Sequence, residues 1–185
     1  MNTTILLFCA GLALPTLCAA GSIFVLPSLK VVELGNSFSL DVNVSGLSDF
    51  YAFQFDVGFE PGVLAATNIS EGSLFSSLGV FFSPGSIDNT AGTITFVSDS
   101  LSGPGPGLDT DGTLATITFN AVGYGASVVS LWNVTLLDSS INTVLATTSG
   151  ATVNVTPEPA TWTLMCFVGA ALAVRALLSR LHATR

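Results

Sequence analysis

Residues 51–59 read YAFQFDVGF. Every second position carries an aromatic or apolar side chain, namely Tyr51, Phe53, Phe55, Val57 and Phe59. Because successive side chains of a β-strand point to opposite faces, this alternation predicts a strand with one face packed against a core. The aromatic side chains are bulky enough to fill the ~10 Å between two packed sheets, which favours a sandwich over a barrel.

Short runs of the same kind lie on both sides of this strand. Gly, Pro, Asn or Asp residues separate them at intervals of about eight to twelve residues, and no window keeps the 3.6-residue period of a helix. Further strands are predicted at 23–26, 37–44, 63–69, 80–83, 93–97, 113–122, 127–137 and 151–155. The predicted fold class is therefore all-β, a sandwich of about nine strands.

The predicted strands fall within residues 21–156, which are long enough for one domain with a sizeable core. This part contains eleven Asp and Glu residues and a single base, Lys30, so its net charge is −10. Such a surface repels phosphate backbones, which makes nucleic acid a poor partner. All three cysteines, Cys9, Cys18 and Cys166, lie outside this part, so packing rather than disulfides must hold the domain together.

The last segment, residues 157–185, combines a tripeptide, an apolar stretch and a basic end. Pro157-Glu158-Pro159 precedes an apolar stretch that, counted from Ala160 to Leu181, has 22 residues, enough for the predicted transmembrane helix because about 20 cross a bilayer. The positive-inside bias places the end with Arg175, Arg180 and Arg185 in the cytoplasm. This order resembles the PEP-CTERM sorting signal of Gram-negative bacteria, which implies recognition by exosortase, a membrane protease. An ordinary tail anchor that stays in place is the alternative.

Residues 1–20 have the features of a signal peptide. An apolar run from Ile5 ends in Cys18-Ala19-Ala20-Gly21, whose small residues suit signal peptidase, with cleavage expected after Ala20. Leu17 before Cys18 argues against lipoprotein processing. We therefore expect an exported protein that is first held in the inner membrane and then reaches the cell surface or extracellular matrix.

The residues that support catalysis are scarce in the domain. His182, the only histidine, lies in the C-terminal segment, and the domain has no thiol, which excludes Ser-His, Cys-His and metal-His sites there. Asp56 and Glu60 are the nearest pair of acids along a strand. Because their side chains alternate with those of the inward-facing Phe55 and Val57, both acids are predicted to point to solvent. A glycosidase instead requires two carboxyl groups that face one another across a cleft. We expect no enzyme.

Two further groups of residues are candidates for binding. Asp109 and Asp111 stand before a glycine as in part of a calcium loop, but an Asp-Gly turn explains them without a metal, and we expect no cofactor. Phe82 and its neighbour Phe81 must face opposite sides if they lie on a strand, so one faces outward. Exposed aromatic side chains for a partner or a glycan are predicted at Tyr51, Phe82, Tyr124 and Trp132.

Five motifs in order resemble the cohesin family. Val31-Val32-Glu33-Leu34-Gly35 is followed by Phe53 to Phe59 with Glu60-Pro61-Gly62-Val63-Leu64, then by Ile94-Thr95-Phe96, 112–119 and 150–155. The resemblance implies a nine-stranded jelly-roll sandwich, which cohesins share with some carbohydrate-binding modules. It implies binding of another protein, as cohesins bind dockerins, with exopolysaccharide binding as the alternative.

Overall fold

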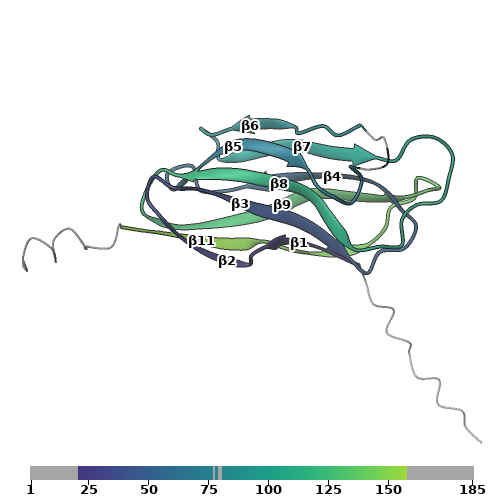
Figure 1. Cartoon of the computed structure of the whole chain (residues 1–185), viewed down its shortest axis with the longest axis horizontal. Helices are drawn as coiled ribbons and strands as arrows, with labels where there is room; N and C mark the ends of the chain where they lie inside the picture. Colours follow the sequence, from purple (N-terminus) through teal and green to yellow (C-terminus); the bar gives the residue numbers. More distant parts are fainter. Residues whose placement is uncertain (1–20, 77, 79–80, 158–185) are drawn as a thin grey trace, which may run out of the picture.

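The computed structural model describes residues 21–76, 78 and 81–157, and these form strands but no helix (Figure 1). The strands are β1 (Gly21–Leu26), β2 (Leu29–Glu33), β3 (Ser37–Ser45), β4 (Phe50–Gly58), β5 (Leu64–Glu71), β6 (Ser86–Asp88), β7 (Thr93–Ser100), β8 (Gly112–Ala121), β9 (Gly125–Asp138), β10 (Ala146–Ser149) and β11 (Ala151–Thr156). The signal peptide predicted at 1–20 and the sorting segment from Glu158 onward lie outside the described residues. Within the described part, no helix is long and apolar enough to span a membrane.

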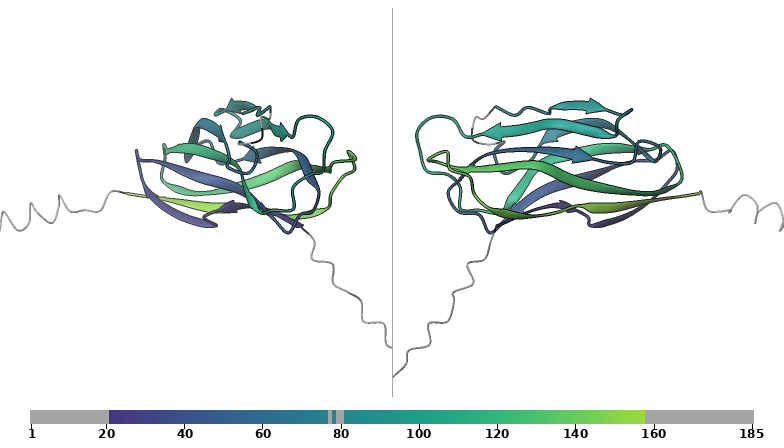
Figure 2. Two further views of the ribbon diagram at one scale, coloured as in Figure 1. Left: turned by 45° about the vertical axis from the view of Figure 1, so that its right-hand side comes forward. Right: turned by 180° about the vertical axis from the view of Figure 1, so that it is seen from behind.

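The strands form two sheets that face each other as a sandwich (Figure 2). The five-stranded sheet has the order β10-β1-β3-β8-β5, and the six-stranded sheet has the order β2-β11-β9-β4-β7-β6. The described chain begins and ends at opposite ends of this sandwich (Figure 1). The predicted all-β jelly-roll class is confirmed.

The described residues form eleven strands where the sequence predicts about nine. The missed strands β2, β6 and β10 each form a sheet edge and have three to five residues, so no long alternation marks them. The strand predicted at 80–83 is wrong in its described part, because Ser83 makes only an isolated bridge to Ser98. Edge segments are the hardest to recognise, since only one neighbour and little burial constrain their side chains.

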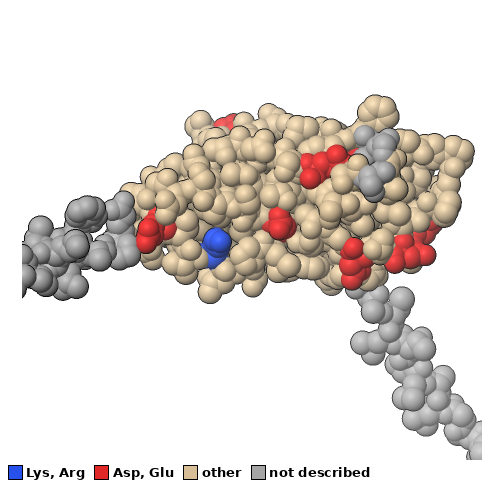
Figure 3. All heavy atoms as spheres, in the orientation of Figure 1, with Lys and Arg blue, Asp and Glu red and all other residues tan. Residues whose placement is uncertain are grey.

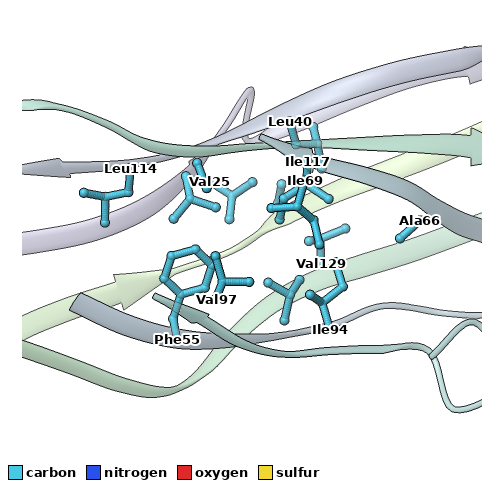
Figure 4. Close-up of a cluster of buried hydrophobic side chains, with 14 of the residues drawn as sticks. Val25, Leu40, Phe55, Ala66, Ile69, Ile94, Val97, Leu114, Ile117 and Val129 are labelled. Carbon is cyan, nitrogen blue, oxygen red and sulfur yellow. The ribbon is translucent and has the colours of Figure 1, made fainter. Parts of the chain in front are cut away.

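The core lies between the sheets and is filled by the faces that alternation predicts (Figure 4). Phe55 and Val97 point into it from the six-stranded sheet, and Leu40 and Ile117 meet them from the other; each is fully or almost fully buried. Complete burial of such a side chain contributes about 1.5–3 kcal/mol. Toward one end, Phe50, Phe53 and Phe75 stack with ring centroids 5.3–6.4 Å apart. The core therefore fixes both sheets and leaves their outer faces free.

Candidate functional site

The outer face of the five-stranded sheet consists mainly of hydroxyl and amide groups that bond to one another. We call it the hydroxyl face. Side-chain hydrogen bonds of 2.6–3.1 Å cross its strands between Ser22 and Ser45, Ser37 and Asn120, Ser39 and Thr118, Asn43 and Thr113, and Asp41 and Thr116. Because these polar groups already have protein partners, the face offers few unsatisfied groups. Leu26, at the end of β1 beside Asp41, is its large exposed apolar side chain at 44%.

The outer face of the six-stranded sheet is different, because it exposes large apolar side chains. Phe96 on β7 is 61% exposed, and Val128 and Trp132 on β9 are 66% and 43% exposed. The Trp132 ring reaches over Gly58 of β4: a Cβ atom added to Gly58 would lie 3.8 Å from the indole Nε1. We call the surface formed by Phe96, Val128 and Trp132 over Gly58 the aromatic face.

Asp56 lies in the middle of the aromatic face, and its surroundings correct a prediction. It points away from the core, as alternation predicts, but it is only 5% exposed and not in solvent. Its Oδ1 accepts the Phe96 N–H at 2.7 Å and its Oδ2 accepts the Asn133 Nδ2 group at 2.8 Å. Its register partner on β9 is Trp132. Phe96, Asp56 and Trp132 thus form a row across β7, β4 and β9.

Two irregularities in strand pairing produce this row. The pairing of β4 with β7 shifts between Phe55 and Val57, and that of β4 with β9 shifts between Gln54 and Asp56. Phe96 and Asn133, the residues bonded to Asp56, have φ values of 66° and 48°. This left-handed conformation is unfavourable for a bulky residue such as phenylalanine and needs support from its surroundings. Regular alternation counted from the buried Ile94 would have turned Phe96 inward.

A hollow of about 490 Å³ adjoins the aromatic face. Gly58, Ser130 and Val128 line one side, and Glu60 with the loop residue Gly92 lines another. Glu60 is exposed, as predicted, but it lies beyond the end of β4. Because Asp56 is buried and its two oxygens are occupied, Asp56 and Glu60 do not present two carboxylates to a shared cleft.

Of the four predicted aromatic residues, only Trp132 belongs to the aromatic face. Tyr51 is partly buried and its hydroxyl donates to the Gly103 carbonyl. Phe82 packs against the core, while its neighbour Phe81 is 83% exposed. Tyr124 is 60% exposed before β9. Sequence reasoning missed Phe96 and Val128; the adjacent pair Phe96-Val97 carried the same signal as Phe81-Phe82, since two neighbours on a strand cannot both face the core.

The carboxylates of Asp109 and Asp111 accept hydrogen bonds from backbone N–H groups. Asp109 Oδ1 accepts the Asp49 N–H at 2.7 Å, and Asp111 Oδ1 accepts the Gly46 N–H at 2.8 Å. Asp49 in turn accepts hydrogen bonds from Ser139 and the Gly107 N–H, which lower the pKa of its carboxyl group. Among the described residues, no group of three or more His, Cys, Asp or Glu side chains is arranged to hold a metal ion. These acids tie loops together.

Two carboxyl groups enter the interior from opposite sheets. Asp99 on β7 is 3% exposed and is paired with the inward-facing Phe53, while Glu71 ends β5 opposite the buried Ala115. Asp99 Oδ2 and Glu71 Oε1 are the buried side-chain oxygens of the described part that have no hydrogen-bond partner. Burial, and to a smaller extent the charge of Glu71, raises the pKa of Asp99 to about 6. Asp56 and Asp99 are therefore both buried, but both oxygens of Asp56 accept hydrogen bonds whereas Asp99 Oδ2 has no partner.

Charge is sparse and almost entirely negative on the surface (Figure 3). The single blue patch in Figure 3 is Lys30, the only Lys or Arg between residues 21 and 157. Asp88, on the edge strand β6 of the six-stranded sheet, is exposed, and hydrogen bonds from the Ala91 and Thr90 N–H groups lower the pKa of its carboxyl group. Glu60 at the hollow and Asp88 on β6 are thus acids of this side of the sheet, whereas Lys30 lies on the opposite edge strand β2.

Comparisons with known proteins identify the fold. A non-cellulosomal cohesin from the archaeon Archaeoglobus fulgidus is 14% identical over 78% of this chain and 97% of that chain, with a TM-score of 0.60. A type II cohesin domain from the Acetivibrio cellulolyticus cellulosome is 16% identical over 73% and 95%, with a TM-score of 0.63. The sixth cohesin of A. cellulolyticus scaffoldin B, solved with a mutant Cel5 dockerin, is 22% identical over 74% and 99%, with a TM-score of 0.62.

These identities show the fold alone, whereas a family model tests the sequence itself. No protein with a curated description is similar enough to this chain to count as a match. The cohesin domain model matches residues 24–156, which is most of the chain and nearly all of the sandwich. The chain therefore belongs to the cohesin family.

Proposed function

We propose that this domain is a non-catalytic module that binds another protein through the aromatic face. The observation that carries the proposal is the group of three exposed apolar side chains, Phe96, Val128 and Trp132, on one sheet surface. A contiguous exposed apolar surface on a folded domain marks an interaction site more often than chance exposure does. Tryptophan is also among the residues that contribute most at protein interfaces.

Membership of the cohesin family supports a protein partner. Similar solved structures from Acetivibrio cellulolyticus and Clostridium thermocellum are complexes of a cohesin with a dockerin. A dockerin-bearing protein is therefore the class of partner that we propose first. The acids near the aromatic face, Glu60 and Asp88, favour a partner that carries basic residues around its apolar contact.

Site-specific photocrosslinking in the host tests this proposal. A photoreactive phenylalanine analogue in place of Phe96 is compared with the same analogue in place of Ser39 on the hydroxyl face. We expect a protein crosslink from position 96 and none from position 39. The crosslinked protein is then purified, and its affinity should fall when Trp132 is replaced by alanine. Equal crosslinking from both positions, or none from position 96, would contradict the proposal.

Carbohydrate binding is the second candidate, because Trp132 is half-exposed beside a hollow of about 490 Å³. An aromatic ring next to a shallow hollow can stack against a sugar, and an exopolysaccharide would suit the environment that the C-terminal segment indicates. Glycan arrays distinguish the two functions. Saturable glycan binding that is lost in Trp132→Ala, together with no protein crosslink from position 96, would favour the carbohydrate.

The proposal includes export and sorting. Strand β1 begins at Gly21, the residue after the expected signal-peptidase site, and Pro157 follows β11 in an exposed position. Cleavage at either end would therefore leave the sandwich intact. We propose that exosortase recognises Pro157-Glu158-Pro159 and delivers the domain to the cell surface or matrix. Mass spectrometry of the mature protein should find ends near Gly21 and residues 156–159, whereas a C-terminus at Arg185 would mean a permanent anchor.

A further inference from the structure

We propose that Asp56 is a positioning residue that holds the aromatic face in its binding shape before any partner arrives. The inference deepens the proposed function and takes its biological meaning from it, but the geometry that carries it is independent of any partner. It concerns how Phe96 and Asn133 are held in a backbone conformation with positive φ, and how that conformation sets the direction of the Phe96 and Trp132 rings.

The first step is the place of Asp56 in the sheet. β4 lies between β7 and β9, so a side chain on its outer side can reach both neighbours. Asp56 uses one oxygen for each: Oδ1 accepts the Phe96 N–H of β7 and Oδ2 accepts the Asn133 amide of β9. These partners lie 40 and 77 residues away in the chain. One carboxylate therefore joins three strands on the outer side of the sheet.

The second step is what the backbone needs at these positions. Where β4 pairs with β7, the register passes from Phe55–Val97 to Val57–Ile94, so the bulge that contains Phe96 faces Asp56. A bulge disrupts the hydrogen-bond ladder, and an unpaired buried N–H group is costly. The side-chain oxygen of Asp56 replaces the missing main-chain acceptor. It thereby stabilises a φ of 66° that phenylalanine rarely adopts.

The third step is why the residue is an acid. A carboxylate is an acceptor only, so both of its oxygens can receive the two N–H groups at once, and such charge-assisted bonds are the stronger kind. The group is 5% exposed although it lies on the outer side of the sheet. Its neighbours along the row, Phe96 and Trp132, lie on either side of it, which keeps water from competing for its oxygens.

The consequence is a preorganised surface. The bulge at Phe96 turns its ring outward, and the irregularity at Asn133 follows Trp132 directly. Because Asp56 fixes both irregularities, it fixes the spacing of the two rings across β4. A partner then binds without first having to order them, which improves affinity.

The test uses the full chain with Trp162→Phe, which leaves Trp132 as the only tryptophan. Two signals are measured without any partner: acrylamide quenching of Trp132 fluorescence, and the amide resonance of Phe96 in protein labelled with 15N-phenylalanine, identified by its loss in Phe96→Leu. In Asp56→Ala we expect stronger quenching and an upfield shift of the Phe96 amide. Asp56→Asn should keep both signals closer to those of the parent than Asp56→Ala does, because an amide can still accept from Phe96 and donate to a rotated Asn133, although without the charge.

Asn133→Ala removes only the hydrogen bond from Asn133 to Asp56 and keeps the one from Phe96. It also replaces Asp56→Ala as the test variant if that variant does not fold. It should increase Trp132 quenching while leaving the Phe96 amide in place. Asp41→Ala, which removes a hydrogen-bonded acid from the hydroxyl face, is the matched control and should change neither signal. The proposal is overturned if Asp56→Ala changes only the melting temperature, or if Asp56→Asn behaves like Asp56→Ala. Neither result depends on whether a partner protein is found.

Discussion

The hydroxyl face and the aromatic face lie on opposite sides of one core, yet they differ in what they offer to another molecule (Figure 2). On the hydroxyl face, pairs such as Ser39 and Thr118 bond to each other across neighbouring strands. On the aromatic face, Phe96 and Trp132 present ring surface to solvent and the polar group between them, Asp56, is buried. The first face satisfies its own groups, whereas the second leaves apolar area to be covered.

Strand irregularities alone do not explain the difference. The five-stranded sheet also has register shifts, between Val42 and Asn43 and between Ala66 and Asn68. There the residues left out of the pairing are Leu114, which is buried, and Thr67, whose hydroxyl donates to the Thr118 carbonyl. In the six-stranded sheet the unpaired residue at the surface is Phe96. Where a bulge brings an extra side chain to the surface, its chemistry decides whether the face stays inert or becomes a binding surface.

A substitution in the core, which supports both faces, should cause the largest loss of folding stability. Phe55→Ala removes a fully buried ring below the aromatic face, and we expect it to lower the free energy of unfolding by about 3–5 kcal/mol. Urea denaturation measures the change. Phe81→Ala, at a residue 83% exposed, is the control of the same chemistry and should cost little. A similar loss in both variants would mean that burial does not set these energies.

Removing the Phe96 and Trp132 rings should weaken binding by the aromatic face while leaving the fold intact. Phe96→Ala combined with Trp132→Ala should weaken binding of the crosslinked partner by about 2 kcal/mol or more, roughly 30-fold, because aromatic residues dominate interface energies. Calorimetry with the purified partner measures it. Ser39→Ala combined with Thr118→Ala is the matched pair on the hydroxyl face and should bind normally. Loss of binding in that pair alone would reverse the assignment of the faces.

Acid should stabilise the folded domain through Asp99. The pKa of Asp99 is raised from 3.8 to about 6 in the folded protein, so the folded state binds the proton more tightly than the unfolded chain. The cost of the ionised group is therefore present above pH 6 and is relieved as the pH falls from about 6 toward 4.

The melting temperature, compared between the parent and Asp99→Asn, isolates this contribution. The parent should gain stability on going from pH 7 to pH 5 relative to Asp99→Asn, which has no group to titrate there. Asp49, Asp88 and Asp138, whose pKa values are lowered by hydrogen bonds, act in the opposite sense and only at lower pH. Equal gains in parent and variant would show that Asp99 has an ordinary pKa.

Single changes on the hydroxyl face should have the smallest effect. Thr118→Ala removes an exposed hydrogen bond of 3.1 Å to Ser39, and we expect a loss of no more than about 1 kcal/mol in stability. The same urea titration measures it. A loss as large as that of Phe55→Ala would mean that the ladder, and not the core, holds the five-stranded sheet.

The sequence predicted the strand faces well because their signal is local. Alternation in residues 51–59 placed Phe53, Phe55 and Val57 in the core, and all three are buried. The cohesin motifs also predicted the family that the domain model confirms. Edge strands such as β6 escaped prediction because three residues carry no readable period.

The candidate site was only partly predictable. Trp132 was identified as an outward aromatic residue, but Phe96 was missed, because its neighbour Val97 indicates only that one of the two faces outward and not which one. Asp56 was expected in solvent, since nothing near it in the chain indicates cover. Of the Phe81-Phe82 pair, Phe82 was predicted to be the exposed residue, and this was wrong: Phe82 packs against the core and the exposed residue is Phe81.

The sequence by itself determined the all-β class, the cysteine-free and acidic character of residues 21–156, and the side of the strand at 51–59 that enters the core. These properties depend on composition and on a two-residue period, which any short segment displays. Only the tertiary structure decided which outer face is apolar and why Asp56 is buried. A bulge shifts alternation by one residue, and the groups that hold it, Phe96 and Asn133, come from strands that meet β4 only in the folded sheet.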